Sequence, residues 1–235
     1  MSLLNNLPGG YFIAGTDTGV GKTLIACALI HALASQGKRV AGMKPLASGA
    51  TWQDGAWRND DVEALRAVAN VRLTPALMNP YLLRAATAPH IAAAREGIQI
   101  DLQHIVNCFA AIGHTQPPPD TIIVEGAGGF LVPLNDLHDG GDLACRLGLP
   151  VILVVGIRLG CINHALLTCQ AISARQLVLA GWVANIISPE LLHVQATIAS
   201  LQSRIKAPLL GCIPQLPQTD PAMLVKSAAA LLTLP

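Results

Sequence analysis

The sequence is poor in charged residues, which make up 12% of its 235 residues, against roughly 25% in an average soluble protein. Fifteen basic and fourteen acidic residues give a net charge of +1, which excludes the strongly basic surface of a nucleic-acid-binding protein. Long apolar runs are also missing. The longest, Leu24–Ala34 and Leu147–Ile157, fall well short of the roughly 18 residues that a membrane-spanning helix needs. With 52% hydrophobic residues, we predict a soluble chain with a large buried fraction and no membrane partner.

Cysteine patterns that would indicate a metal centre or a disulfide framework are missing as well. The six cysteines include no C-x-x-C pair and have no histidine at zinc-site spacing, so we predict reduced thiols in apolar surroundings. No basic segment precedes the apolar residues near the N-terminus, which argues against a secretory signal. We therefore expect a cytoplasmic protein.

Short apolar runs alternate with amphipathic stretches along the whole sequence. Runs rich in Val, Ile and Leu predict buried strands over Tyr11–Gly15, Val40–Lys44, Thr121–Glu125, Val151–Ile157, Val178–Ile187 and Leu209–Ile213. The stretches between them predict helices over Lys22–Ser35, Asp61–Ala69, Pro89–Glu96, Leu102–Ile112, Asn163–Arg175, Leu191–Ile205 and Ala222–Leu232. This alternation predicts one α/β domain over residues 1–235. Its doubly wound, mostly parallel sheet would have helices on both faces and ligands at the carboxyl ends of the strands.

The first predicted strand runs into Gly15-Thr16-Asp17-Thr18-Gly19-Val20-Gly21-Lys22-Thr23, and a helical pattern follows at once. This stretch departs by one place from the phosphate-loop pattern G-x-x-x-x-G-K-[ST], because Thr16 stands at the first glycine position. The chemistry still suits a nucleotide. Backbone N–H groups at a helix N-terminus attract phosphates, a lysine reaches the β- and γ-phosphates, and a threonine hydroxyl binds Mg²⁺. The alternative is a glycine turn that exposes Lys22.

Acidic residues at predicted strand ends are candidates for the other ligands of a magnesium ion. Glu125 closes an apolar strand and precedes Gly126-Ala127-Gly128-Gly129, where small residues let a phosphate or another backbone approach. The alternative for Glu125 is a surface or helix-capping side chain. Asp60 and Asp61 precede a helical pattern, so one of them either binds the metal or caps the helix.

A second lysine ends the second predicted strand, in Lys44-Pro45-Leu46-Ala47-Ser48-Gly49. Two lysines at one phosphate site favour transfer of the γ-phosphoryl group over nucleotide binding alone. Ser48 is not the nucleophile of an acyl hydrolase, because Leu46 stands where the pattern G-x-S-x-G needs its first glycine.

Two asparagines at later strand ends have two interpretations each. Asn163 follows Gly160-Cys161-Ile162 and opens a predicted helix, so it either belongs to a carboxylate site at the helix N-terminus or simply caps the helix. Asn185 ends the run Gly181-Trp182-Val183-Ala184 and either contacts the edge of a base or starts a turn. Both interpretations remain open for each asparagine.

Taken together and in this order, these strand-end motifs resemble those of the dethiobiotin synthetase family of biotin biosynthesis, in the deviant phosphate-loop NTPase superfamily. The resemblance covers nearly the whole chain. It implies an ATP- and Mg²⁺-dependent cyclo-ligase that converts 7,8-diaminononanoate and CO₂ to dethiobiotin, with release of ADP and phosphate. The implied route is a carbamate on one amine, its phosphorylation to a carbamic-phosphoric anhydride, and ring closure by the neighbouring amine.

The resemblance also implies roles for individual residues. Catalysis would involve Lys44, Lys22 and Thr18, and the metal would be held by Thr23, Asp61 and Glu125. The substrate would be bound by Ser48 and, across the interface of a homodimer, by the turn of Gly160, Cys161, Ile162 and Asn163. ATP would be bound by Gly19, Val20, Gly21, Lys22, Thr23, Leu24, Asp61, Glu125, Gly126, Ala127, Gly128, Asn185, Ile186, Pro214, Gln215 and Leu216.

Two other functions compete with this interpretation. A positioning or partition ATPase of the related phosphate-loop group would resemble its relatives in a lysine at position 17, and Asp17 stands there instead. A non-catalytic, dethiobiotin-synthetase-like sensor domain is the second alternative. The presence of all three implied metal ligands argues against it.

Overall fold

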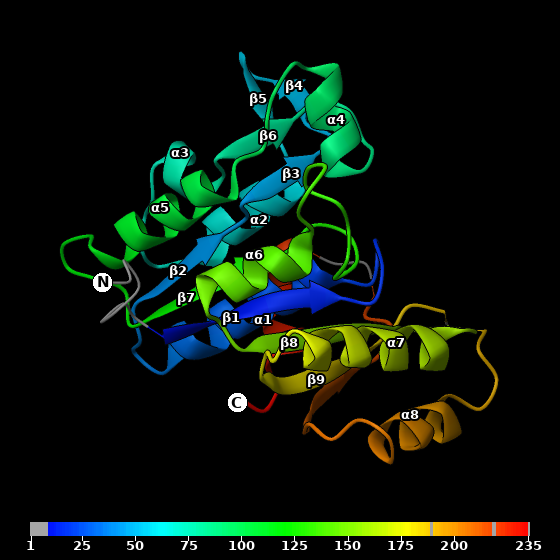
Figure 1. The fold of residues 1–235 in the computed structure, drawn as a ribbon. Coiled ribbons are helices and arrows are strands. Elements are labelled where there is room, and N and C mark those ends of the chain that lie inside the picture. Colours follow the sequence, from blue (N-terminus) through cyan, green and yellow to red (C-terminus); the bar gives the residue numbers. More distant parts are fainter. Residues whose placement is uncertain (1–8, 189, 218–219, 235) are drawn as a thin grey trace.

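The computed structural model of the chain describes residues 9–188, 190–217 and 220–234 (Figure 1). Its centre is a six-stranded sheet in the order β10-β9-β8-β1-β7-β2, in which every neighbouring pair is parallel. The strands are β1 (Gly9–Gly15), β2 (Val40–Met43), β7 (Thr121–Glu125), β8 (Val151–Ile157), β9 (Leu179–Ile186) and β10 (Leu209–Ile213). The predicted doubly wound parallel sheet is confirmed.

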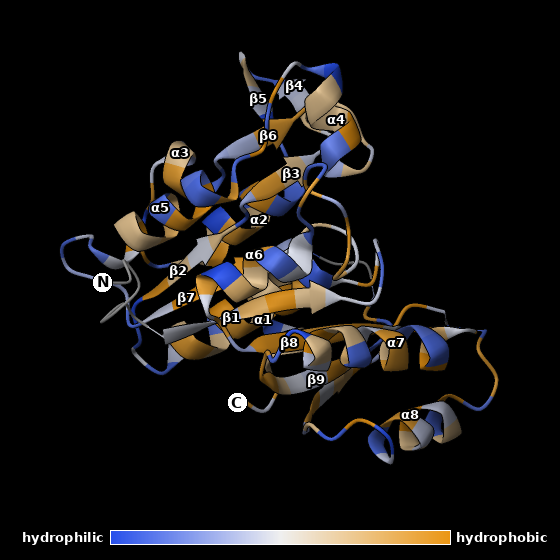
Figure 2. Cartoon of the chain, viewed as in Figure 1, coloured by the Kyte–Doolittle hydropathy of each residue, from blue (hydrophilic) through white to orange (hydrophobic). Residues whose placement is uncertain are grey.

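Helices cover both faces of this sheet. One face carries α1 (Lys22–Ser35), α2 (Asp60–Val68) and α9 (Pro221–Ala229), and the other carries α5 (Leu102–Gly113), α6 (Gly140–Leu147), α7 (Cys161–Ala174) and α8 (Val194–Gln202). Successive residues of β1 enter opposite cores, since Ile13 packs with the α1 side and Phe12 and Ala14 with the α5 side. Strands made mostly of hydrophobic residues (Figure 2) are what burial on both faces requires. No helix in the described part of the chain is long and apolar enough to cross a membrane.

Among the described residues, four short strands lie outside the central sheet, and the sequence did not predict them. β3 (Leu46–Ser48) pairs in parallel with β6 (Tyr81–Leu83), and β4 (Thr51–Gln53) forms an antiparallel hairpin with β5 (Ala56–Arg58). Figure 1 shows the hairpin at one end of the molecule beside α4 (Pro89–Arg95), whereas α3 (Pro75–Met78) lies nearer α5. The hairpin therefore joins the end of β3 to the start of α2 by a route outside the core.

Four predicted helix starts are corrected by the structure, and one of them, that of α9, moves by a single residue from Ala222 to Pro221. Helix α2 begins at Asp60 because Asn59 is its N-cap, so neither Asp60 nor Asp61 caps it. Helix α7 begins at Cys161 with Gly160 as its N-cap, so Asn163 lies inside the first turn and does not cap the helix. Helix α8 begins at Val194 rather than Leu191, because the preceding His193 has a left-handed φ of 59°.

Helix α6 was also missing from the prediction, because it opens with Gly140-Gly141 and glycine disfavours helix. Contacts at the start of the helix explain why it forms. Asp139 and Asp142 build a capping box at its start, and the Arg175 guanidinium lies 2.5 Å from Asp139 Oδ2. A Cβ atom at Gly140 would lie 2.8 Å from the Phe130 carbonyl oxygen, so the close approach of helix and loop requires glycine there.

Candidate active site

The loop between β1 and α1 has the conformation of an anion-binding turn. Gly19 and Gly21 have φ of 73° and 91°, and Gly21 is the N-cap of α1. Lys22 is 7% exposed, and its Nζ donates to the Asp17 carbonyl oxygen at 2.9 Å, so the ammonium group folds back over the loop. The positive end of the α1 dipole and a lysine charge thus lie at one loop, which suits a polyphosphate.

Lys44, directly after β2, lies between two carboxylates. Its Nζ is 2.5 Å from Glu125 Oε1 at the end of β7 and 2.7 Å from Asp61 Oδ2 in the first turn of α2. Thr23 Oγ1, in the first turn of α1, lies 2.7 Å from Asp61 Oδ1 and 2.9 Å from Glu125 Oε1. Four side chains from separate parts of the sequence therefore converge, and Asp61 rather than the exposed Asp60 joins them.

Burial and neighbouring charges shift the pKa values in this cluster. Burial acts to lower the pKa of Lys44, but the carboxylates of Glu125 and Asp61 outweigh it and raise that pKa above the usual lysine value. Partial burial acts to raise the pKa of Asp61, yet the charge and hydrogen bond of Lys44 bring it below the usual range. Burial raises the pKa of Glu125, which is 1% exposed. Burial and the Lys44 charge lower the pKa of Lys22 to about 8, so an anion placed beside Lys22 would stabilise its protonated form.

A cavity of about 410 Å³ adjoins the cluster. Four predicted site residues line it, namely Thr18, Lys44, Ser48 and Asp61, and the rest of the wall includes apolar groups of Leu46, Pro89 and Val132. The Ser48 hydroxyl oxygen is buried and has no hydrogen-bond partner among the described residues. The cavity thus offers polar groups on one side and an apolar wall elsewhere.

Comparisons with known proteins identify the family. A family described as an AAA domain matches residues 9–223. The ATP-dependent dethiobiotin synthetase BioD of Aromatoleum aromaticum is 51% identical over 220 residues, which cover 94% of this chain and 96% of that protein. The chain belongs to the dethiobiotin synthetase family. BioD of Janthinobacterium sp. is 49% identical over 215 residues and 90% of both chains. The resemblance of the strand-end motifs is confirmed.

Solved structures show that the fold of this dethiobiotin synthetase family member is shared more widely. The MinD cell division protein of Aquifex aeolicus matches 93% of this chain and 86% of its own, at a TM-score of 0.55 and 18% identity. MinD of Pyrococcus horikoshii, in complex with Mg-ADP, matches the same shares at a TM-score of 0.52 and 17% identity. The likeness extends to the fold alone. At position 17, where the partition ATPases were expected to have lysine, Asp17 Oδ2 lies 2.6 Å from Arg158 Nη2.

The oxygen atoms implied as metal ligands in the dethiobiotin synthetase family fit a magnesium ion in this chain. The Thr23 hydroxyl has one hydrogen but lies within hydrogen-bond distance of both Asp61 and Glu125. The second oxygen of Glu125, Oε2, is buried with no hydrogen-bond partner in the described part of the chain. A cation coordinated there would satisfy these oxygens, and a set of oxygen donors with two carboxylates is what Mg²⁺ prefers.

The residues that the dethiobiotin synthetase resemblance assigns to adenine lie at the same edge of the sheet. Asn185 of β9 is in register with Ile213 of β10, so Pro214, Gln215 and Leu216 leave the sheet beside it, and Ile186 follows it in β9. Asn185 is 6% exposed, and its Nδ2 donates to the Val20 carbonyl oxygen at 2.8 Å. In this structure Asn185 therefore supports the phosphate loop, and its contact with a base stays a prediction.

The turn at the start of α7 is not brought to the cavity by the fold of one chain. Gly160 has a φ of 89°, and the N–H groups of Cys161 and His164 donate to Arg158 and Gly160 carbonyl oxygens. Helix geometry gives the N–H groups of Ile162 and Asn163 no acceptor within α7. None of the residues from Gly160 to Asn163 lines the 410 Å³ cavity, so their contact with the substrate stays a prediction.

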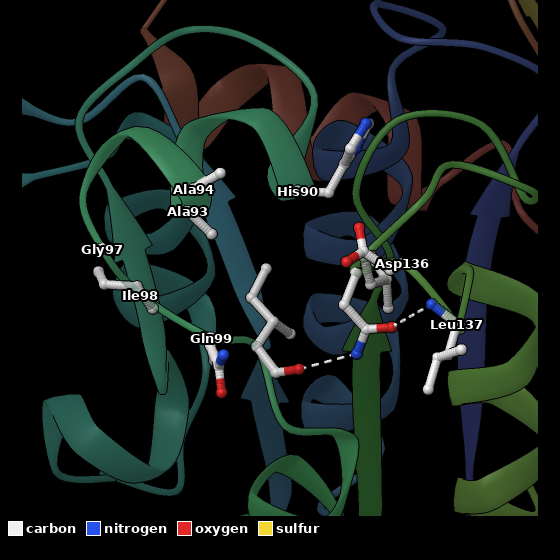
Figure 3. A pocket seen from close by; sticks show the side chains of 11 residues that line it. His90, Ala93, Ala94, Gly97, Ile98, Gln99, Asp136 and Leu137 are labelled. Atoms are coloured by element: carbon white, nitrogen blue, oxygen red, sulfur yellow. Dashed lines mark hydrogen bonds between the residues drawn. The ribbon is translucent and has the colours of Figure 1, made fainter.

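A larger cavity, of about 690 Å³, lies between α4 and the loop at residues 134–137 (Figure 3). Asn135 on its wall donates from Nδ2 to the Ile100 carbonyl oxygen at 2.8 Å and accepts at Oδ1 from the Leu137 N–H at 2.9 Å. These polar atoms therefore hold the loop in place. None of the site residues implied by the dethiobiotin synthetase resemblance lines this cavity, so volume alone does not mark the reaction site.

Gly21→Ala is expected to damage the phosphate loop. A Cβ atom at Gly21 would lie 2.2 Å from Asn185 Nδ2, at a φ of 91° that alanine rarely adopts. Strain of about 1–3 kcal/mol should raise the dissociation constant for Mg-ATP about tenfold or more, as measured by calorimetry. Gly37→Ala is the matched control, because Gly37 has a φ of 83° with nothing within 4 Å and lies past the other end of α1. Equal losses of affinity in the two variants would contradict the expectation.

Proposed function

We propose that this chain forms dethiobiotin from 7,8-diaminononanoate and CO₂, with ATP as co-substrate, Mg²⁺ as cofactor, and ADP and phosphate as the other products. Family membership supports the overall reaction. The observation that carries the mechanism is the buried ammonium of Lys44, which is 4% exposed and lies beside the phosphate loop on the wall of the 410 Å³ cavity. Bicarbonate in solution supplies the CO₂.

In the first step, one amine of the diamine attacks CO₂, a C–N bond forms, and a proton leaves to give a carbamate anion. The Lys44 ammonium binds this anion, and its raised pKa keeps it charged. The hydroxyls of Thr18 and Ser48 contact the amine end of the substrate. This role gives a hydrogen-bond partner to the Ser48 hydroxyl, which has none among the residues that the structure describes.

In the second step, a carbamate oxygen attacks the γ-phosphorus of ATP, and the bond to the ADP oxygen breaks. Two anions must approach each other, and the charges of Lys22 and Lys44 reduce their repulsion. The second amine then attacks the carbonyl carbon of the anhydride, phosphate leaves, a proton is lost and the cyclic urea closes. Mg²⁺, held by Thr23, Asp61 and Glu125, supplies further positive charge at the phosphates when bound. No covalent protein nucleophile is needed.

An assay of the purified chain tests the reaction. With diaminononanoate, bicarbonate, ATP and Mg²⁺, we expect one dethiobiotin and one phosphate for each ATP consumed. The control contains ATP and Mg²⁺ without the diamine. Phosphate release at the same rate in that control, with no dethiobiotin in the full mixture, would favour a nucleotide-switched ATPase. Absence of ATP turnover under both conditions would favour a sensor domain.

The length of the substrate supports a site shared by two subunits. The carboxylate of diaminononanoate lies about seven carbons from the amines, and at roughly 1.25 Å per bond it extends far beyond a compact phosphate pocket. Within one chain, the turn from Gly160 to Asn163 does not reach the cavity. We therefore propose a C₂ homodimer in which this turn binds the carboxylate of the substrate held by the other subunit.

Mixing two inactive variants tests the shared site. Lys44→Ala removes the ammonium that is proposed to bind the carbamate in the cavity. Replacing Asn163 by a bulkier residue such as Phe prevents the turn from binding the substrate carboxylate. Exchange of subunits should give heterodimers with one intact site, so up to about a quarter of wild-type activity should return, because half of the dimers in a statistical mixture are heterodimers with one of two sites. No regained activity, or a fully active monomer in sedimentation at assay concentration, would rule out the shared site.

A further inference from the structure

We propose that Asn59 is a positioning residue that holds the substrate-contacting Ser48 and the metal-binding Asp61 in fixed relation. The inference rests on the roles proposed above for Ser48 and Asp61. Asn59 is not among the site residues expected from the sequence, and it does not line the 410 Å³ cavity. Asn59 acts through the backbone of Ser48 and Asp61, which do line the cavity.

One side-chain amide makes both connections. Asn59 Nδ2 donates to the Ser48 carbonyl oxygen at 3.1 Å. Asn59 Oδ1 accepts from the Asp61 N–H at 3.1 Å and from the Val62 N–H at 3.4 Å, and these bonds cap α2. The amide nitrogen of Asn59 therefore holds the end of β3, and its amide oxygen holds the first turn of α2.

The route of the chain explains why this link is needed. Between Ser48 and Asn59 the backbone passes through the β4–β5 hairpin, whose residues are mostly exposed. Pairing with β6 holds Ser48 on one side, since the Ala50 N–H donates to the Leu83 carbonyl oxygen at 3.0 Å. That pairing does not involve α2. The amide of Asn59 adds a direct link between the Ser48 backbone and the first turn of α2, whereas Lys44 on the same wall contacts Asp61 through its side chain.

Two substitutions can separate the N-cap function of Asn59 from its hydrogen bond to the Ser48 carbonyl oxygen. Serine is as good an N-cap as asparagine, but its shorter side chain has no amide donor to reach the Ser48 carbonyl. Asn59→Ser should therefore keep the start of α2 and lose the hold on Ser48. Alanine provides neither a cap nor a donor, so Asn59→Ala should lose both.

Kinetics and calorimetry test the assignment. For Asn59→Ser we expect the dissociation constant and KM for diaminononanoate to rise about tenfold, the effect of one hydrogen bond. We also expect the KM for Mg-ATP to stay within about twofold of wild type, because the α2 cap remains. For Asn59→Ala we expect the same rise for the diamine and, in addition, a several-fold higher Mg²⁺ requirement, because the cap of α2 beside Asp61 is lost.

Asp101→Ala is the matched control for a lost helix cap. Asp101 is the N-cap of α5, its side chain accepts from the Gln103 N–H at 2.8 Å, and it is exposed. This variant should lower the melting temperature as Asn59→Ala does, without changing the affinity for the diamine.

Unchanged diamine binding in Asn59→Ser, or a change equal to that in Asp101→Ala, would overturn the positioning role. Wild-type protein that forms no dethiobiotin would instead contradict the proposed function. The calorimetric comparison of wild type with Asn59→Ser does not depend on turnover, so it decides the positioning role in that case too. A higher dissociation constant for the diamine in Asn59→Ser than in wild type supports the positioning role, and equal dissociation constants overturn it.

Discussion

Lys44→Ala is expected to lower the turnover number by about 10²–10³-fold, the usual loss when one preorganised charge at a transition state is removed. The ammonium of Lys44 lies 2.5 Å from Glu125 and 2.7 Å from Asp61, and it faces the cavity where the carbamate is proposed to form. Affinity for Mg-ATP should change less than carbamate formation. Nuclear magnetic resonance with ¹³CO₂ measures the bound carbamate directly, and equal occupancy in variant and wild type would refute this role.

Stability needs a separate control in this experiment, because the alanine leaves the buried Glu125 without its ammonium partner. Breaking a buried ion pair in this way typically costs about 3–5 kcal/mol. Lys44→Gln keeps much of the side-chain volume and the ability to donate hydrogen bonds, so it separates loss of charge from loss of packing. Lys226→Ala, in the exposed part of α9, should leave both turnover and melting temperature near wild type.

Lys22→Ala is expected to weaken Mg-ATP binding and to reduce phosphoryl transfer by about 10²-fold or more, because the variant lacks a charge at the β- and γ-phosphates. The Lys22 ammonium donates to the Asp17 carbonyl oxygen, and within the described part of the chain it forms no salt bridge that binding of a phosphate would have to break. Calorimetric titration with Mg-ATP and steady-state kinetics measure the two effects. Full Mg-ATP turnover in Lys22→Ala would contradict the assignment of this loop as the phosphate-binding loop. Lys38→Ala, at an exposed position past the other end of α1, is the control.

The sheet and the phosphate loop could be predicted from the sequence because local signals are strong there. A strand buried on both faces must be apolar at nearly every position, which sets Val151–Ile157 apart from its surroundings. The loop before Lys22 needs left-handed residues at positions 19 and 21, and glycine stands at both. Glu125 and Lys44 were found because Glu125 ends such a strand and Lys44 directly follows one, and the carboxyl ends of parallel strands lie at one edge of the sheet.

Features that depend on distant contacts could not be predicted. Asp139 and Arg175 stabilise α6 despite its two initial glycines, and Arg175 comes from the end of a later helix. The ion pair between Asp17 and Arg158 joins loops that are far apart in the sequence. Asn59 did carry a local signal, since an asparagine before Asp60 and Asp61 is a typical helix cap. Its second hydrogen bond, to Ser48, depends on the hairpin that folds the chain back.

The strand order has a consequence for how the chain folds. β1 carries the phosphate loop, and its two neighbours in the sheet are β7 and β8, with Gly9 opposite Thr121 and Phe12 opposite Val151. One edge of β1 therefore stays unpaired until residues 121–125 have been synthesised, and the other until residues 151–157 have been synthesised. Closing loops of this length costs entropy before the new contacts can offset it, so folding of such a parallel sheet is intrinsically slow. During that delay the unpaired backbone N–H and C=O groups along the edges of β1 can pair with strands of other chains, so aggregation competes with folding at this stage.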